Sequence, residues 1–267
     1  MIHIATVHWN TDRWVAVQAA FLRRYVRTDF RVYAWLNDIP NAPVDSFYYT
    51  CAEPVGPHAV KLNILADIIS ASTNRRDDLL IFLDGDAFPV AEIEPLLSRH
   101  LPAHKLMAVQ RLENNGDIQP HPCFCATTVG FWQELRGDWK EGYKWKDHGG
   151  REVTDVGGNL LKQLADKGTD WMPLVRSNTV NLHPLFFGIY GGAIYHHGAG
   201  FRIGECRADG ATLELEPVDR FFSKLLPGYG RRARRKIWRK IIAANDTLSE
   251  QVFERIKQDP QFHQQFL

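Results

Sequence analysis

The chain has 267 residues, of which 45% are hydrophobic and 24% charged, and its formal net charge is +1 at pH 7. This length suits one large α/β domain or two small ones, and the composition is that of a globular protein. No apolar run is long enough to span a bilayer, and residues 1–10 lack the features of a secretory signal. We therefore expect a cytoplasmic protein whose four cysteines, Cys51, Cys123, Cys125 and Cys206, are reduced thiols.

Strands and helices are predicted to alternate in the N-terminal half. In chain order, we expect a strand at 2–7, a polar loop at 8–12, a helix through 14–25, a strand at 30–36, a helix at 59–70 and an apolar strand ending at 84. This β-α-β-α-β order predicts a parallel sheet with right-handed crossovers. In the second half we expect helices at 92–100 and 155–166, strands at 105–110, 124–130 and 191–197, and a loop at 137–151.

The motif Asp84-Gly85-Asp86 directly follows the apolar run 79–83. Such a run indicates a strand that is buried on both faces, and ligands of an open α/β sheet collect at the carboxyl ends of its strands. Two carboxylates therefore project where a ligand would lie, and Gly85 allows a close backbone approach. Hard oxygen ligands there suit Mg²⁺ or Mn²⁺ that bridges a diphosphate. The alternative is an ordinary Asp-Gly turn.

With these elements in place, the chain resembles the GT-A class of nucleotide-sugar glycosyltransferases. The resemblance depends on the Asp-x-Asp motif at 84–86, the Gly-rich Asp motif TDVGGN at 154–159, and YHHGAGFR at 195–202. The last segment is similar to the late His-x-x-Gly…Lys element of family 8 glycosyltransferases, although this chain has Arg in place of Lys. The resemblance implies an α/β fold of GT-A type, a Rossmann-like mixed sheet with a parallel N-terminal half. It places a catalytic domain at 1–205 and a basic helical appendage at 206–267.

The resemblance implies that the activity is a metal-dependent hexosyl transfer. The donor would be a nucleoside diphosphate sugar, specifically a UDP-sugar, and the cofactor Mn²⁺ or Mg²⁺. The acceptor would be a glycan or a lipid-linked molecule, as in the synthesis of bacterial lipopolysaccharide or capsule. Two alternatives stay open: a nucleotidyltransferase or nucleotide-sugar hydrolase on a related fold, and a non-enzymatic basic membrane-binding module.

The resemblance also assigns a metal site. Asp84 and Asp86 would hold the ion together with His196 or His197, and Arg202 would contact the diphosphate. The spacing to Arg202 favours His196, whereas the spacing to Gly200 favours His197. Because successive strand residues face opposite sides, we expect one of them to be the ligand and prefer His196.

Further residues are expected near the donor, with Asp84 toward its ribose. They are His8, Trp9 and Asn10 after the first strand, Lys61 and Asn63 in the helix before the Asp-x-Asp motif, and Gln110 and Arg111 after a later strand. The alternative for Trp9 is a place in the core, and a solvated helix position is the more ordinary explanation for Lys61. The alternative for Arg111 is a pairing with an acid such as Glu113.

Asp155 is the candidate acid/base residue on the acceptor side, because adjacent glycines allow close approach to its carboxylate. An inverting transferase needs one carboxylate to deprotonate the acceptor hydroxyl, whereas a retaining one does not. The sequence does not choose between these outcomes. The alternative is that Asp155 caps the following helix.

The C-terminal part is strongly basic. Residues 231–240 (RRARRKIWRK) carry seven basic residues and no acid, which leaves the rest of the chain at −6 (+1 less +7). Basic residues interleaved with apolar ones predict an interfacial helix that binds an anionic membrane, with Phe221, Phe222, Leu225 and Leu226 adding apolar surface. We therefore expect peripheral association with the inner face of the cell membrane. The alternative is a basic face docked on the acidic body, and nucleic-acid binding is not expected.

Overall fold

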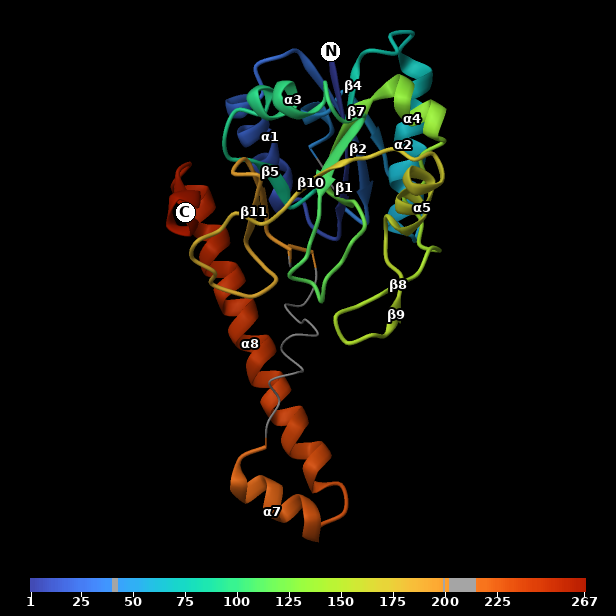
Figure 1. The fold of residues 1–267 in the computed structure, drawn as a ribbon. Helices are drawn as coiled ribbons and strands as arrows, with labels where there is room; N and C mark the ends of the chain where they lie inside the picture. The colour runs from blue at the N-terminus through green and yellow to red at the C-terminus, as the bar shows by residue number, and fades with distance from the viewer. Residues whose placement is uncertain (40–42, 199, 202–214) are drawn as a thin grey trace. The chain divides into compact units, whose positions relative to one another are not determined.

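A computed structural model describes residues 1–39, 43–198, 200–201 and 215–267 (Figure 1). The chain separates into two compact units. The larger consists of residues 1–201 and 263–267, and the smaller of residues 202–262. Arg202 and Cys206 lie outside the described residues.

A seven-stranded sheet forms the centre of the larger unit. Its strands are, in spatial order, β10 (Met172–Leu174), β6 (Leu106–Val109), β7 (His121–Thr128), β4 (Leu79–Asp84), β1 (Ile2–Trp9), β2 (Phe30–Asn37) and β3 (Tyr49–Cys51). Strands β4, β1, β2 and β3 are parallel, and β7 runs antiparallel to both of its neighbours. This arrangement confirms the predicted α/β class, with a parallel N-terminal half and a mixed second half.

The carboxyl ends of β1 and β4 lie side by side, because Val7 is in register with Asp84. Chain order runs outward from β1 to β2 and β3 on one side and resumes with β4 on the other. Connections therefore leave in opposite directions at β1 and β4, which makes this edge of the sheet a topological switch point. In doubly wound sheets that switch point is where ligands bind.

Helices cover both faces of the sheet, as Figure 1 shows. On one face lie α1 (Arg13–Tyr25) and α3 (Glu94–His100), and on the other α2 (His58–Ser72), α4 (Val129–Leu135) and α5 (Gly158–Asp166). Leu22 and Leu97 belong to the first core cluster, whereas Leu65 and Leu164 belong to the second. Burial of these apolar faces is the main force that fixes the helices on the sheet.

A small antiparallel sheet lies beside the main one. It contains β11 (Gly188–Tyr190), β12 (Ile194–His196) and β5 (Ala87–Pro89), which begins one residue after Asp86. His196 is in register with Ala87, so the pairing of β12 with β5 brings the late histidine to the Asp-x-Asp turn. The remaining short elements are η1 (Val44–Ser46), β8 (Trp145–Lys146), β9 (Glu152–Val153) and η2 (Phe262–Phe266).

Several boundaries differ from the sequence-based predictions. Strand β1 continues through Trp9, and the strand expected at 124–130 gives way to helix α4 at Val129. Residues 191–193 form a turn rather than the start of a strand. The short strands β3, β5, β8, β9, β10 and β11 were not predicted. Two or three residues carry too little periodicity to mark a strand.

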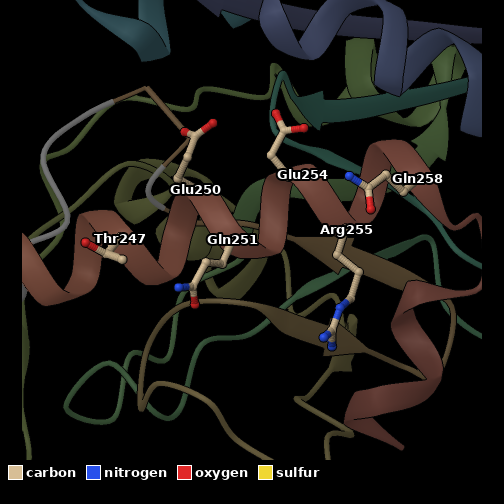
Figure 2. A pocket seen from close by; sticks show the side chains of 6 residues that line it. All are labelled: Thr247, Glu250, Gln251, Glu254, Arg255 and Gln258. Carbon is tan, nitrogen blue, oxygen red and sulfur yellow. The ribbon is translucent and has the colours of Figure 1, made fainter.

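The smaller unit contains α7 (Pro217–Leu225) and the 30-residue helix α8 (Tyr229–Gln258), separated by a turn with Gly228 at φ +78°. The Tyr229 hydroxyl donates a hydrogen bond to Asp219 (2.8 Å), which joins the two helices. None of the described helices has the length and apolar character that would let it cross a bilayer. Figure 2 shows an open pocket along α8, lined by Thr247, Glu250, Gln251, Glu254, Arg255 and Gln258.

Candidate active site

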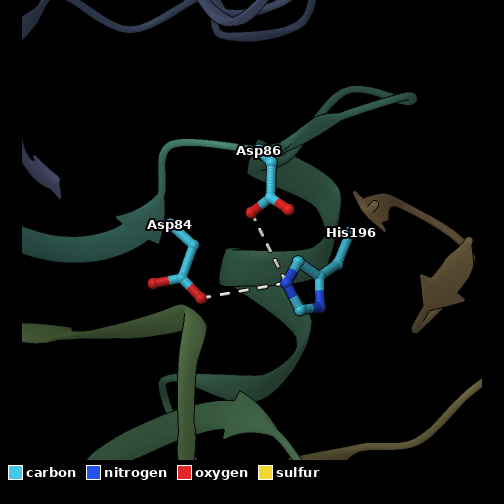
Figure 3. Close-up of side chains that lie close together, drawn as sticks. All are labelled: Asp84, Asp86 and His196. Atoms are coloured by element: carbon cyan, nitrogen blue, oxygen red, sulfur yellow. Dashed lines mark ion pairs between the residues drawn. The ribbon is translucent and has the colours of Figure 1, made fainter. Parts of the chain in front are cut away.

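Three side chains converge at the carboxyl end of β4. Asp84 is the last residue of β4, Asp86 follows Gly85 in the turn into β5, and His196 ends β12. The Nε2 atom of His196 lies 3.8 Å from Oδ2 of Asp84 and 3.6 Å from Oδ1 of Asp86 (Figure 3). The Asp-Gly sequence therefore forms the ordinary turn considered above and, within that turn, presents both carboxylates to one imidazole.

This cluster has the dimensions of a site for one divalent cation. One ligand atom from each residue can be chosen so that all three lie within 4.8 Å of one another. Ligands about 2.1 Å from an octahedral ion are about 3.0 Å apart when adjacent and about 4.2 Å when opposite. The separations of 3.6 and 3.8 Å lie between these two spacings. Two carboxylates and one imidazole suit Mn²⁺ or Mg²⁺.

Backbone groups fix the orientation of Asp86. Its Oδ2 accepts hydrogen bonds from the amides of Gly198 (3.1 Å) and Gly200 (3.0 Å), while its Oδ1 lies toward His196. Burial, with the neighbouring charge of Asp84, raises the pKa of Asp86 from 3.8 to about 6, and the backbone amides oppose this rise. A carboxylate so costly to charge is stabilised by a cation beside it.

Two side chains of helix α1, neither of them predicted from the sequence, form hydrogen bonds that support the Asp-Gly-Asp turn. The Trp14 indole donates to the Gly200 carbonyl (2.9 Å). The buried amide of Gln18 donates to the carbonyls of both Asp84 and Ala87 (2.8 Å each), so it joins the two ends of the turn. A polar residue one helical turn after Trp14, inside an apolar stripe, was the signal available in the sequence.

His197 belongs to the core. Its ring packs against Trp14 and Phe187, with centroids 4.6 and 4.9 Å away, and its Nδ1 lies 2.9 Å from the Tyr195 hydroxyl. Burial lowers its pKa to about 3. His196 and His197 thus face opposite sides, as strand alternation predicts, and His196 is the one beside the carboxylates.

The residues expected in the first loop occupy different environments. His8 is fully buried inside β1, and burial lowers its pKa to about 4. Trp9, by contrast, is 43% exposed, which excludes a place in the core, and its indole donates to Asp38 (3.2 Å). Asn10 is exposed, with φ +60°. Trp9 and Asp38 therefore form a partly exposed pair where β1 and β2 end.

Helix α2 also differs from expectation. Lys61 is 4% exposed rather than solvated, and burial lowers its pKa against the opposing charge of Asp38. The side-chain amide of Asn63 binds residues 138–139 through both of its polar atoms. Its Nδ2 donates to Asp138 (2.6 Å), and its Oδ1 accepts from the Trp139 amide (3.0 Å). Asn63 is thus occupied in the fold, whereas Lys61 is buried and interacts electrostatically with Asp38, the residue after β2.

The two residues after β6 have partners within the protein. Gln110 donates to the Ile118 carbonyl (3.3 Å). Arg111 is buried and donates to the Leu185 carbonyl (3.2 Å), and its Nε lies 3.9 Å from Glu113. The alternative pairing of Arg111 with Glu113 is therefore present.

Asp155 does not cap the helix that follows it. Helix α5 begins at Gly158, with Gly157 in the N-cap position at φ +94° and without a side-chain cap. The Asp155 carboxylate accepts from the amide of Val156 (2.8 Å) and is half-buried. Its charge acts on His58 at the start of α2, and so does that of Asp86. Asp155 and Asp86 of the carboxylate cluster thus both interact electrostatically with the same histidine.

No family model and no curated protein matches this chain. Among solved structures, TarS residues 1–349 of S. aureus aligns with 52% of this chain and 50% of its own, at 8% identity and a TM-score of 0.37. The catalytic domain of Drosophila β1,4-galactosyltransferase 7, in complex with xylobiose, aligns over 64% and 63%, with 12% identity and a TM-score of 0.42. The glycosyltransferase GlyE of Streptococcus pneumoniae TIGR4 aligns over 64% and 44%, with 14% identity and a TM-score of 0.41.

Each alignment thus spans less than two thirds of the solved chain. Similarities this distant do not define a function, which has to be inferred from the geometry of the site.

Proposed function

We propose that this protein is a metal-dependent glycosyltransferase that moves a sugar from a UDP-sugar to a glycan or lipid-linked acceptor in bacterial surface polysaccharide synthesis. One observation carries the proposal: Asp84, Asp86 and His196 converge at the switch point between β1 and β4. A divalent cation held there faces the place where doubly wound sheets bind nucleotides. The sequence resemblance to the GT-A class supplies the reaction.

Departure of a nucleoside diphosphate leaves negative charge that the site must stabilise. A Mn²⁺ or Mg²⁺ ion bound by the three residues would supply Lewis-acid stabilisation of that charge. We assign Lys61 to the same task, because it is a buried cation that interacts electrostatically with Asp38, the residue after β2. Arg202 is assigned to the diphosphate from the sequence resemblance, with a guanidinium fork that suits phosphate oxygens.

The nucleoside is assigned to the ends of β1 and β2. An indole that is 43% exposed and held by a hydrogen bond to Asp38 gives Trp9 a fixed face on which a base can stack. Asp155 is assigned to the acceptor, as the base of an inverting reaction or as a stabilising carboxylate in a retaining one. Its freedom from helix capping and its coupling to His58 support this assignment.

A panel of nucleotide sugars, each with and without Mn²⁺, tests the donor assignment by thermal shift. A ligand at 100 times its dissociation constant stabilises the folded state by about 2.7 kcal/mol. For a chain of this size we expect a rise in Tm of about 5–10 °C. The rise should occur with a UDP-sugar and Mn²⁺ together and disappear with EDTA. A metal-independent rise, or none with any nucleotide sugar, would contradict the proposal. Product analysis with a labelled donor, with and without acceptor, separates transfer from hydrolysis or nucleotidyl transfer.

We assign an anionic membrane surface to the smaller unit. In α7, apolar side chains lie at helical spacing and face solvent: Val218 is 65% exposed, Phe221 59% and Leu225 60%. The first turns of α8 contain residues 231–240 with their seven cations. An apolar helix face joined to a basic segment suits the interface of an anionic bilayer. Such binding would place the active site near a lipid-linked acceptor.

Vesicle co-sedimentation tests the membrane assignment. Anionic lipid contributes about 1 kcal/mol per basic residue near the surface, so the double substitution Arg231→Gln and Arg234→Gln should weaken binding about 10- to 30-fold. Arg75→Gln, at a side chain 68% exposed in the larger unit, is the matched control. Equal binding to neutral and anionic vesicles, or an equal loss in the control, would exclude an electrostatic role for the basic segment.

A further inference from the structure

A single buried amide joins the two ends of the Asp-Gly-Asp turn. Gln18 of α1 is 1% exposed, and its Nε2 donates to the carbonyls of Asp84 and Ala87, at 2.8 Å each. An amide NH₂ group carries two hydrogens, so both are in use. Two acceptors that are each 2.8 Å from one nitrogen lie at most twice that distance apart. The span from Asp84 to Ala87, which contains both carboxylates, therefore cannot open while Gln18 is in place.

The same amide also affects the third candidate ligand. Ala87 is the first residue of β5 and is in register with His196 of β12, whereas Asp84 is the last residue of β4. By holding these two carbonyls, Gln18 joins the strand that ends in Asp84 to the strand pair that carries His196. The positions of Asp84, Asp86 and His196 relative to one another thus depend on one side chain.

The helix that carries Gln18 is anchored on β5. Phe21, on the same helix, is buried, and its ring centroid lies 4.4 Å from that of Phe88 in the middle of β5. The adjacent Leu22 belongs to the first core cluster. A buried amide on a packed helix keeps one rotamer, whereas an exposed glutamine samples several. Gln18 therefore holds the turn at a fixed span.

A second residue of α1 acts on the carboxylate of Asp86 itself. Trp14, one turn before Gln18, donates its indole N–H to the Gly200 carbonyl (2.9 Å), and the Gly200 amide donates to Oδ2 of Asp86 (3.0 Å). Residues four apart on a helix lie on the same face. One face of α1 thus supports the backbone of the turn through Gln18 and the orientation of one carboxylate through Trp14.

We infer that Gln18 is a positioning residue of the proposed metal centre, which fixes the spacing of the ligands and thereby favours small divalent cations over Ca²⁺. This inference rests on the proposed metal site and adds to it a residue that acts through the turn rather than as a ligand. Mg²⁺ requires near-ideal octahedral ligands at about 2.0–2.1 Å, whereas Ca²⁺ accepts about six to eight oxygens at about 2.3–2.6 Å in flexible geometry. A turn of fixed span suits the first ion, and a turn that can open suits the second.

Mn²⁺ affinity of the full chain, measured by electron paramagnetic resonance with Mn²⁺ alone and then with Ca²⁺ as competitor, tests the inference. Loss of a residue that supports a metal ligand costs about 10- to 100-fold in metal affinity. We expect such a loss in Gln18→Met, which keeps a side chain of similar length but has no donor. Ca²⁺ affinity should fall less, so the ratio of the two affinities shifts toward Ca²⁺. Circular dichroism checks the fold, and Gln18→Leu takes the place of Gln18→Met if that variant is unfolded.

Leu22→Ala is the matched control. Leu22 lies one helical turn after Gln18, is 3% exposed and packs in the first core cluster. Its truncation leaves a cavity beneath α1 and lowers the stability of the protein, but it leaves the Gln18 amide intact. Below its lowered Tm, this variant should bind Mn²⁺ and Ca²⁺ as the wild type does.

Three results would overturn the inference. Unchanged Mn²⁺ affinity in the Gln18 variants would show that the amide does not position the ligands. An equal loss in Leu22→Ala would reduce the effect to the stability of α1, and an equal loss for Mn²⁺ and Ca²⁺ would exclude a role in spacing. Absence of Mn²⁺ binding to the wild-type chain is a separate failure, because it would remove the metal site of the proposed function and, with it, this role of Gln18.

Discussion

Asp86→Asn is expected to remove metal-dependent sugar transfer while the protein stays folded. The substitution replaces a charged ligand with a weaker neutral one, although the amide oxygen can still accept the hydrogen bonds from Gly198 and Gly200. Stabilisation of charge by a bound metal is worth several kcal/mol, so we expect transfer to fall by at least about 100-fold. Initial rates with a UDP-sugar and Mn²⁺ measure the loss.

The same variant should be more stable than the wild type when no metal is present. Burial and the charge of Asp84 raise the pKa of Asp86 from 3.8 to about 6. A carboxyl whose pKa is raised on folding opposes folding at a pH above that value, because the folded state must carry a charge that it disfavours. A shift of about two units corresponds to about 3 kcal/mol at most, and we expect a gain of about 1–3 kcal/mol at pH 8.

The sign of this effect gives a pH test. As the pH falls from about 6 to about 4, the folded wild type takes up the proton before the unfolded chain does, and the stability advantage of Asp86→Asn should disappear. Urea unfolding in EDTA at several pH values measures it. Asp77→Asn, at a carboxylate 77% exposed, should change neither rate nor stability. Normal transfer by Asp86→Asn would show that the cluster is not the active site.

The sequence predicts the parts of the site that are local. The apolar run before Asp84 predicted both the strand and its end, because a parallel strand that is buried on both faces consists almost entirely of apolar residues. Strand alternation likewise separated His196 from His197. The meeting of His196 with the carboxylates depends instead on β12 pairing with β5 more than a hundred residues earlier. In the sequence, resemblance alone indicated that pairing.

Exposure and side-chain partners were less predictable. Lys61 and Asn63 lie in the expected helix, but one is buried and the other holds Asp138, which depends on how α2 packs on the sheet. His8 was assigned to a loop because the first strand was expected to end at position 7, two residues before the end of β1. The Gln18 hydrogen bonds require helix α1 to be placed against the turn, and single-sequence periodicity does not contain that information.

Gly85→Ala is expected to destabilise the protein and disrupt the metal site together. A Cβ atom at this position would lie 2.6 Å from the Val7 carbonyl oxygen, 2.8 Å from Nδ1 of His8 and 2.8 Å from Cζ of Phe201. The first contact is backbone in a central strand, and His8 is fully buried, so neither can retreat cheaply. Overpacking of this kind costs about 1–3 kcal/mol, or about 3–10 °C in Tm for a chain of this length.

Relief of that clash requires β4 and its turn to move away from β1, which carries Asp84 and Asp86 with it. We therefore expect Mn²⁺ affinity to fall by at least about tenfold in Gly85→Ala, measured by titration below the lowered Tm. Gly56→Ala is the matched control, because nothing lies within 4 Å of its added Cβ. If Gly85→Ala loses stability but keeps wild-type Mn²⁺ affinity, the close approach of β1 and β4 does not fix the positions of the carboxylates. The Gln18 hydrogen bonds would then be the interactions that hold the turn.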